Sequence, residues 1–156
     1  MNAADNARVC SSLQWVIGRL FELLGGWVER IDDPADAVWL AALSRHLGSH
    51  VAVFAELMPD AVLLANECAV APAGSALVDA LGELTDTSDP VGVATALIGQ
   101  LTRECNEVLN DCVSHADGSL QRAVEFLMIG LASAETNVFK PVAKAAETFR
   151  MVAPVV

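Results

Sequence analysis

The sequence predicts an all-α protein: four long helices in one domain spanning residues 1–156. Three observations lead to this prediction. Apolar residues recur at spacings of three and four over four long stretches, which is the period of an α-helix. Ala, Val and Leu dominate the 54% hydrophobic fraction, whereas aromatic residues contribute only 5%. The dipeptide Asp-Pro, which combines an N-cap with a residue suited to the first helical turn, precedes two of these stretches.

The first two helices are expected to form an antiparallel hairpin. The first is predicted over about 5–31, where an apolar stripe continues without a break. The second is predicted over about 34–58, with Asp33 as its cap and Pro34 at its first position. So few residues separate the two stretches that only a tight turn fits between them.

The third and fourth helices, predicted over about 90–115 and 119–140, are expected to form a second hairpin. Residues 59–89 connect the two hairpins and contain a short predicted helix at about 75–84. About thirty residues is long for a connection inside a compact domain. We therefore expect this segment to cross the full length of the helices rather than to form a simple loop.

Charge and hydropathy exclude several kinds of partner. The chain has a net charge of −11 and no cluster of basic residues, which argues against nucleic acid and anionic membrane surfaces as partners. The uncharged run from Val91 to Thr102 is too short to span a bilayer, and no signal-peptide pattern is visible. Four cysteines without close pairing fit a reducing compartment. We therefore expect a cytoplasmic protein with no membrane contact.

Two hairpins joined by one long crossover are typical of the ferritin-like variant of the four-helix bundle. The segment RHLGSHVAVFAELMPD, residues 45–60, resembles small actinobacterial proteins of ferritin-like fold, many of uncharacterised function. Di-metal members of that superfamily use a Glu-x-x-His motif on each of two helices. Here Leu43 and Leu47 stand three residues before His46 and His50, so the motif is missing.

His46 and His50 are the candidate centre of a site. They lie four residues apart on one helical face, which is a spacing that can chelate a metal. The expected hairpin register brings the first helix opposite them, so the candidate pocket residues are Trp15, Arg19, His46 and His50. The alternative interpretation is that His46 is a core or boundary imidazole and that His50 stacks on Trp15.

A catalytic metal site would need further ligands and an open coordination position. The carboxylates nearest the inner faces of the predicted helices are Glu22, Glu104 and Glu135, and the register allows a contact between Glu22 and His46. The alternative metal site therefore consists of Glu22, His46, His50, Glu104 and Glu135, holding iron or another divalent transition metal.

Because the Glu-x-x-His motif is missing, we rank a function without metal above a metal-dependent one. The first hypothesis is a bundle without a metal cofactor that acts as a binding or assembly module, and the alternative is a metal-dependent oxidoreductase. A third is a pocket between the hairpins for an apolar small molecule. A homodimer is also expected, because four large apolar residues fall outside the central stripes of their helices: Trp15, Leu23, Met128 and Ile129.

Overall fold

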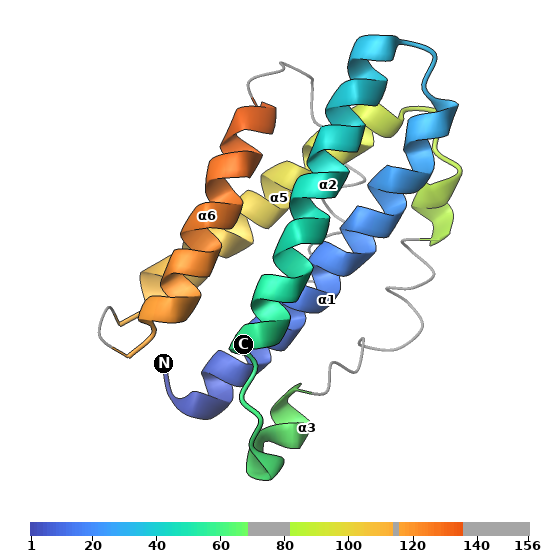
Figure 1. The fold of residues 1–156 in the computed structure, drawn as a ribbon. Coiled ribbons are helices and arrows are strands. Elements are labelled where there is room, and N and C mark those ends of the chain that lie inside the picture. Colours follow the sequence, from blue (N-terminus) through green and yellow to red (C-terminus); the bar gives the residue numbers. More distant parts are fainter. Residues whose placement is uncertain (69–81, 114–115, 136–156) are drawn as a thin grey trace.

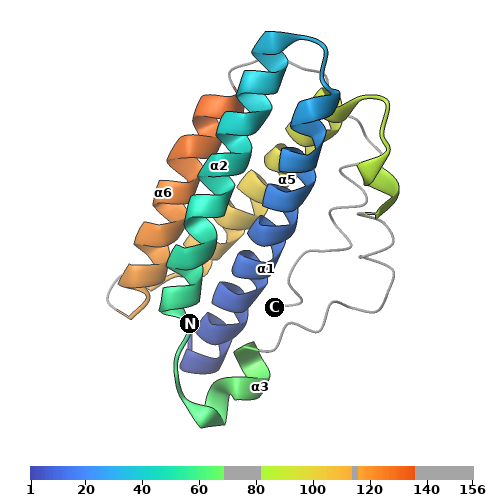
Figure 2. The ribbon, with the colours of Figure 1, turned by 45° about the vertical axis from the view of Figure 1, so that its right-hand side comes forward.

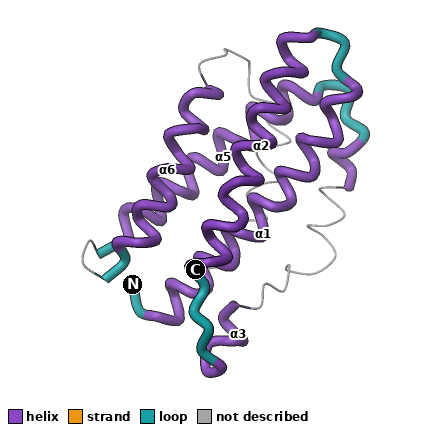
Figure 3. The backbone as a smooth tube through the Cα atoms, in the orientation of Figure 1, coloured by secondary structure: helices purple, strands orange, loops and turns teal. Residues whose placement is uncertain are grey.

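The computed structural model describes residues 1–68, 82–113 and 116–135, and in these ranges the regular structure is helical, without a strand (Figure 3). The expected all-α class is therefore confirmed. Most of the short helix predicted at 75–84, and the end of the fourth predicted helix beyond residue 135, lie outside the described residues. Within them, no helix is both long and apolar enough to cross a bilayer.

The four long helices occur in the predicted order. The elements, with η for a 3₁₀-helix, are α1 (Ala3–Trp27), η1 (Val28–Arg30), α2 (Pro34–Leu57), η2 (Val62–Leu64), α3 (Ala65–Cys68), α5 (Pro90–Asp111) and α6 (Gly118–Glu135). Residues 82–85 are also helical.

Side-chain caps explain where the long helices begin. The side chain of Asn2 accepts a hydrogen bond from the Asp5 N–H at 2.8 Å, so α1 begins two residues before its predicted start. Asp33 caps α2 and Asp89 caps α5, as their Asp-Pro sequences predict.

The third predicted helix ends early. It stops at Asp111 instead of about 115, because Cys112 adopts an extended backbone and the carboxylate of Asp117 accepts the Val113 N–H at 2.9 Å. A side chain beyond the helix therefore fixes the turn, and helix propensity gives no indication of this contact.

The long helices lie side by side. In both ribbon views α2 lies between α1 and α6, and α5 lies on the far side (Figures 1 and 2). The colours in Figure 1 show that α1 runs antiparallel to α2, and α5 antiparallel to α6. Each hairpin thus has the direction that the sequence predicts.

The described ends of the 59–89 connection lie at opposite ends of α1. Near the start of α1, Arg8 pairs with Glu67 at 3.1 Å. Near its end, the indole N–H of Trp27 donates to the carbonyl of Thr85 at 3.0 Å. Between these points α1 rises by roughly 28 Å, so residues 67 and 85 are separated by most of the length of that helix.

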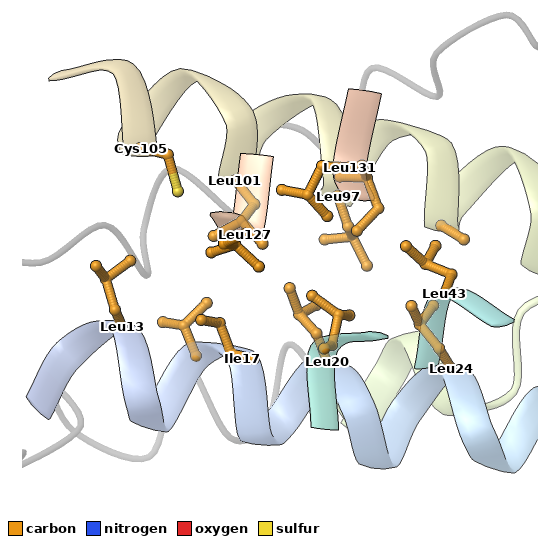
Figure 4. Close-up of a cluster of buried hydrophobic side chains, with 14 of the residues drawn as sticks. Leu13, Ile17, Leu20, Leu24, Leu43, Leu97, Leu101, Cys105, Leu127 and Leu131 are labelled. Atoms are coloured by element: carbon orange, nitrogen blue, oxygen red, sulfur yellow. The ribbon is translucent and has the colours of Figure 1, made fainter. Parts of the chain in front are cut away.

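The core consists mainly of aliphatic side chains, and all four long helices contribute to it (Figure 4). The buried residues labelled in Figure 4 are Leu13, Ile17, Leu20, Leu24, Leu43, Leu97, Leu101, Cys105, Leu127 and Leu131. Burial raises the pKa of the Cys105 thiol to about 12, so this cysteine packs as a neutral, apolar group.

The apolar residues expected at a dimer interface differ in exposure. Trp15, Leu23 and Met128 are partly buried and pack against the core of the same chain. Ile129 is 65% exposed, and the neighbouring Phe126 is 64% exposed. Intrachain packing therefore already covers three of the four residues to a large extent, and the homodimer stays a prediction.

Candidate functional site

His46 joins α2 to α6. Its Nε2 atom lies 3.0 Å from the carbonyl oxygen of Leu127. Because a carbonyl only accepts, Nε2 carries the proton, and Nδ1 of the neutral ring keeps a lone pair. The ring lies against the backbone of Gly130, where a Cβ atom would fall 2.1 Å from two ring atoms of His46. Only glycine fits at position 130 with this arrangement. We call His46, Leu127 and Gly130 the α2–α6 contact.

His50 bonds within its own helix. Its Nδ1 donates to the carbonyl oxygen of His46 at 2.9 Å, which leaves Nε2 with the lone pair in the neutral ring. The two imidazole centroids lie 4.5 Å apart with the rings tilted by 58°. Desolvation by partial burial lowers the pKa of His50, although the bond to the His46 carbonyl acts in the opposite direction.

The other two pocket candidates form a separate cluster on α1. The Arg19 guanidinium lies 5.6 Å from the ring centroid of Trp15, within the range of a cation–π contact. Arg19 also pairs with Glu22 at 2.7 Å, and both charged side chains are more than half exposed. Glu22 therefore pairs with Arg19, while His46 extends toward α6 and bonds to Leu127. The contact expected between Glu22 and His46 is replaced by these two interactions.

The remaining metal-ligand candidates do not gather around the histidines. Glu104 accepts a hydrogen bond from the buried amide of Gln100, one turn earlier on α5. The side chain of Glu135 lies outside the described residues. Across the part of the chain that the structure describes, no three His, Cys, Asp or Glu side chains are grouped closely enough to hold a metal ion.

An open groove lies on the outer face of the first hairpin, and sequence reasoning did not identify it. It has a volume of about 880 Å³ and is lined mainly by apolar and small residues. We call it the outer groove, and its lining residues are Gly18, Phe21, Glu22, Gly25, Val28 and Glu29 from α1 and η1, and Ala41, Ser44, Arg45, Gly48, Ser49 and Val51 from α2. The signal in the sequence that could have indicated it is the adjacent pair Gly25-Gly26, because glycines allow the backbones of two helices to approach closely.

Sequence reasoning also missed Asp117, which precedes α6 and is only 3% exposed. Its carboxylate accepts from the amino group of Met1 at 2.9 Å, from the Asn6 amide at 3.2 Å and from the Val113 N–H. These hydrogen bonds, led by that of the amino group, lower the pKa of Asp117. Because it connects the start of α1 to the α5–α6 turn, Asp117 has a structural role.

The geometry offers two different surfaces: a pair of imidazoles bonded to backbone carbonyls, and a shallow groove lined by small residues. Comparison of the chain with protein-family models, with curated proteins and with solved structures found no match. Among the described residues, no acidic side chain joins the imidazole pair to complete the ligand set of a catalytic metal. A groove with a mainly apolar lining and a few polar side chains can hold a ligand or a partner.

Proposed function

We propose that this protein is a ferritin-like four-helix bundle that has no di-metal centre and acts as a binding or assembly module. Two observations support the ferritin-like part of the proposal. The helices of each hairpin run antiparallel (Figure 1). Residues 67 and 85 lie at opposite ends of α1, as they would if a single crossover joined the hairpins.

The observation that carries the proposed role is the outer groove. The inner faces of the long helices are filled with buried aliphatic side chains, as Figure 4 shows. The outer face of the α1–α2 hairpin is instead hollow, because glycine, alanine and serine occupy much of its floor. A groove between two exposed helix faces is a surface on which another molecule can pack, and it lacks the enclosure that usually protects a reaction from water.

The alternative function, a metal-dependent oxidoreductase, is less well supported. Each histidine uses one ring nitrogen in a hydrogen bond to a backbone carbonyl, and both Glu22 and Glu104 have other partners. One nitrogen of each ring still keeps a lone pair, and a bond from the other nitrogen to a carbonyl is common among metal-binding histidines. Metal binding must therefore be measured directly.

The test is elemental analysis of protein purified without added metal. We expect far less than about one equivalent of iron, manganese or zinc per chain, and a melting temperature that a chelator does not change. His46→Gln and His50→Gln serve as controls. About one equivalent of metal that is lost in both variants, together with a chelator-dependent melting temperature in the native protein alone, would overturn the proposal in favour of the oxidoreductase.

A further inference from the structure

The outer groove exists because α1 and α2 approach each other closely. At Gly25 an added Cβ atom would lie 3.2 Å from the Ser44 hydroxyl, and that hydroxyl donates to the Phe21 carbonyl at 2.9 Å. The floor of the groove is therefore backbone and small side chains, fixed by a hydrogen bond between the helices. A molecule packed on it would meet a preformed surface that need not rearrange.

One aromatic side chain, Phe21, lies in this groove. The ring of Phe21 lies over Gly48, where an added Cβ atom would be 2.9 Å from the ring, and Phe21 is 43% exposed. An exposed phenyl group beside a glycine-lined hollow presents both a projection and a depression on one face. Such a face can pack against a second copy of itself, because a two-fold interface brings the same patch together from both sides.

The charged residues that line the groove also favour a second copy of the chain as the molecule that packs there. Glu29 lines the groove from η1 and Arg45 lines it from α2, and among the described residues neither has an ion pair or a side-chain hydrogen bond. Glu22 is already neutralised by Arg19. The face is therefore locally balanced in charge, although the whole chain carries −11, so two copies could meet here without the repulsion that the rest of the surface would cause.

We infer that the outer groove is a two-fold interface between copies of this chain, in which Arg45 of each copy pairs with Glu29 of the other. This inference rests on the proposed assembly role and specifies the partner. Two reciprocal ion pairs at the rim would fix the register of the two copies, while Phe21 and the glycine-lined floor supply the apolar contact.

Sedimentation velocity over a range of protein concentrations tests the inference. We expect a mass near twice the 16.4 kDa of the chain at high concentration. Ala41→Arg places a long charged side chain in the groove and should weaken the dimer by at least about tenfold. The matched control is Ala42→Arg, an identical change at the next residue of α2, which is exposed and does not line the groove; it should leave the dimer unchanged.

A charge reversal tests the register. Arg45→Glu and Glu29→Arg should each weaken the dimer, and the double variant should recover most of the lost affinity because both pairs are restored with opposite polarity. Arg122→Glu on α6 makes the same charge change away from the groove and should have no comparable effect.

Several outcomes would overturn the inference. A monomer at every concentration would do so, as would a dimer that tolerates Ala41→Arg but dissociates on Ile129→Arg, which would place the interface on α6. A monomer whose groove binds an apolar dye would indicate a small-molecule occupant. None of these results involves metal, so each is distinguishable from the stoichiometric metal content that would overturn the proposed function.

Discussion

Two surfaces that involve α2 are built around glycine, but one is tightly packed and the other is open. At the α2–α6 contact, the imidazole of His46 fills the space above Gly130 so completely that a single methyl group would overlap with it. In the outer groove, Gly25 and Gly48 lie beside a hollow that Phe21 covers only in part. Glycine thus makes room for a neighbouring side chain in one place and leaves an open hollow in the other.

A glycine in a helix therefore indicates a close approach of two helices but does not reveal what fills the space beside it. Position 130 is filled because a long, hydrogen-bonding side chain on the adjacent helix extends over it. Near Gly25 the neighbour is the short side chain of Ser44, which reaches only as far as the backbone of α1. The difference in packing between the two surfaces can be tested by comparing the free energies of unfolding of variants at each one.

The largest expected effect is that of Gly130→Ala. The added methyl group would overlap with the His46 ring, so the ring or α6 must move, and overpacking of this kind costs roughly 1–3 kcal/mol or more. The intrinsic gain of about 1 kcal/mol from replacing glycine in a helix offsets only part of this cost. Urea unfolding followed by circular dichroism measures the loss. A Gly130→Ala protein as stable as the native one would contradict the observed contact.

The second effect is that of His46→Ala. Removing the ring deletes a hydrogen bond to Leu127 and leaves a gap over Gly130, with an expected loss of roughly 1–3 kcal/mol. The sharper result comes from the double variant. In the His46→Ala background, Gly130→Ala should stabilise the protein by up to about 1 kcal/mol, since the space is vacant and only helix propensity remains. Equal effects of Gly130→Ala in both backgrounds would show that the two residues are not coupled.

A third, smaller effect is a dependence on pH. The folded pKa of His50 is lowered by burial, so the unfolded chain, with its ordinary value near 6.5, takes up a proton first as the solution is acidified. The contribution of His50 to stability should be constant above about pH 6.5 and should decrease below that value. Urea unfolding at a series of pH values measures the slope, and His50→Gln should reduce it. A slope that is the same in both proteins would assign the dependence to other groups.

The smallest effect belongs to the groove. Gly48→Ala would bring a methyl group against the Phe21 ring, but that ring is exposed on one side and can swing away. The gain in helix propensity should offset the displacement, so we expect a change of less than about 1 kcal/mol. Gly26→Ala, where an added Cβ atom meets nothing within 4 Å, is the control and should be mildly stabilising. A loss at Gly48 as large as that at Gly130 would show that the groove is as tightly packed as the α2–α6 contact.

Local sequence patterns were sufficient to predict the helical class, the approximate extent of the long helices and most of their buried faces. These features depend on local chemistry: the period of the apolar residues, and caps such as Asp33 and Asp89 that act within one turn. The end of α5 was missed because it depends on Asp117, which accepts the Val113 N–H and is itself held by Met1 and Asn6, more than a hundred residues earlier in the sequence.

The contacts of the candidate site residues could not be predicted from local sequence, because they depend on how the helices pack. The period of a helix places His46 beside the buried stripe, but it does not say which of two adjacent helices the imidazole will reach. The register of the hairpin suggested Glu22 on α1, whereas the ring extends to α6, where Gly130 gives it space and the Leu127 carbonyl accepts its hydrogen bond. Contacts between helices depend on the rotation and separation of the helix axes, and these are set by the packing of the whole core rather than by any one stretch of sequence.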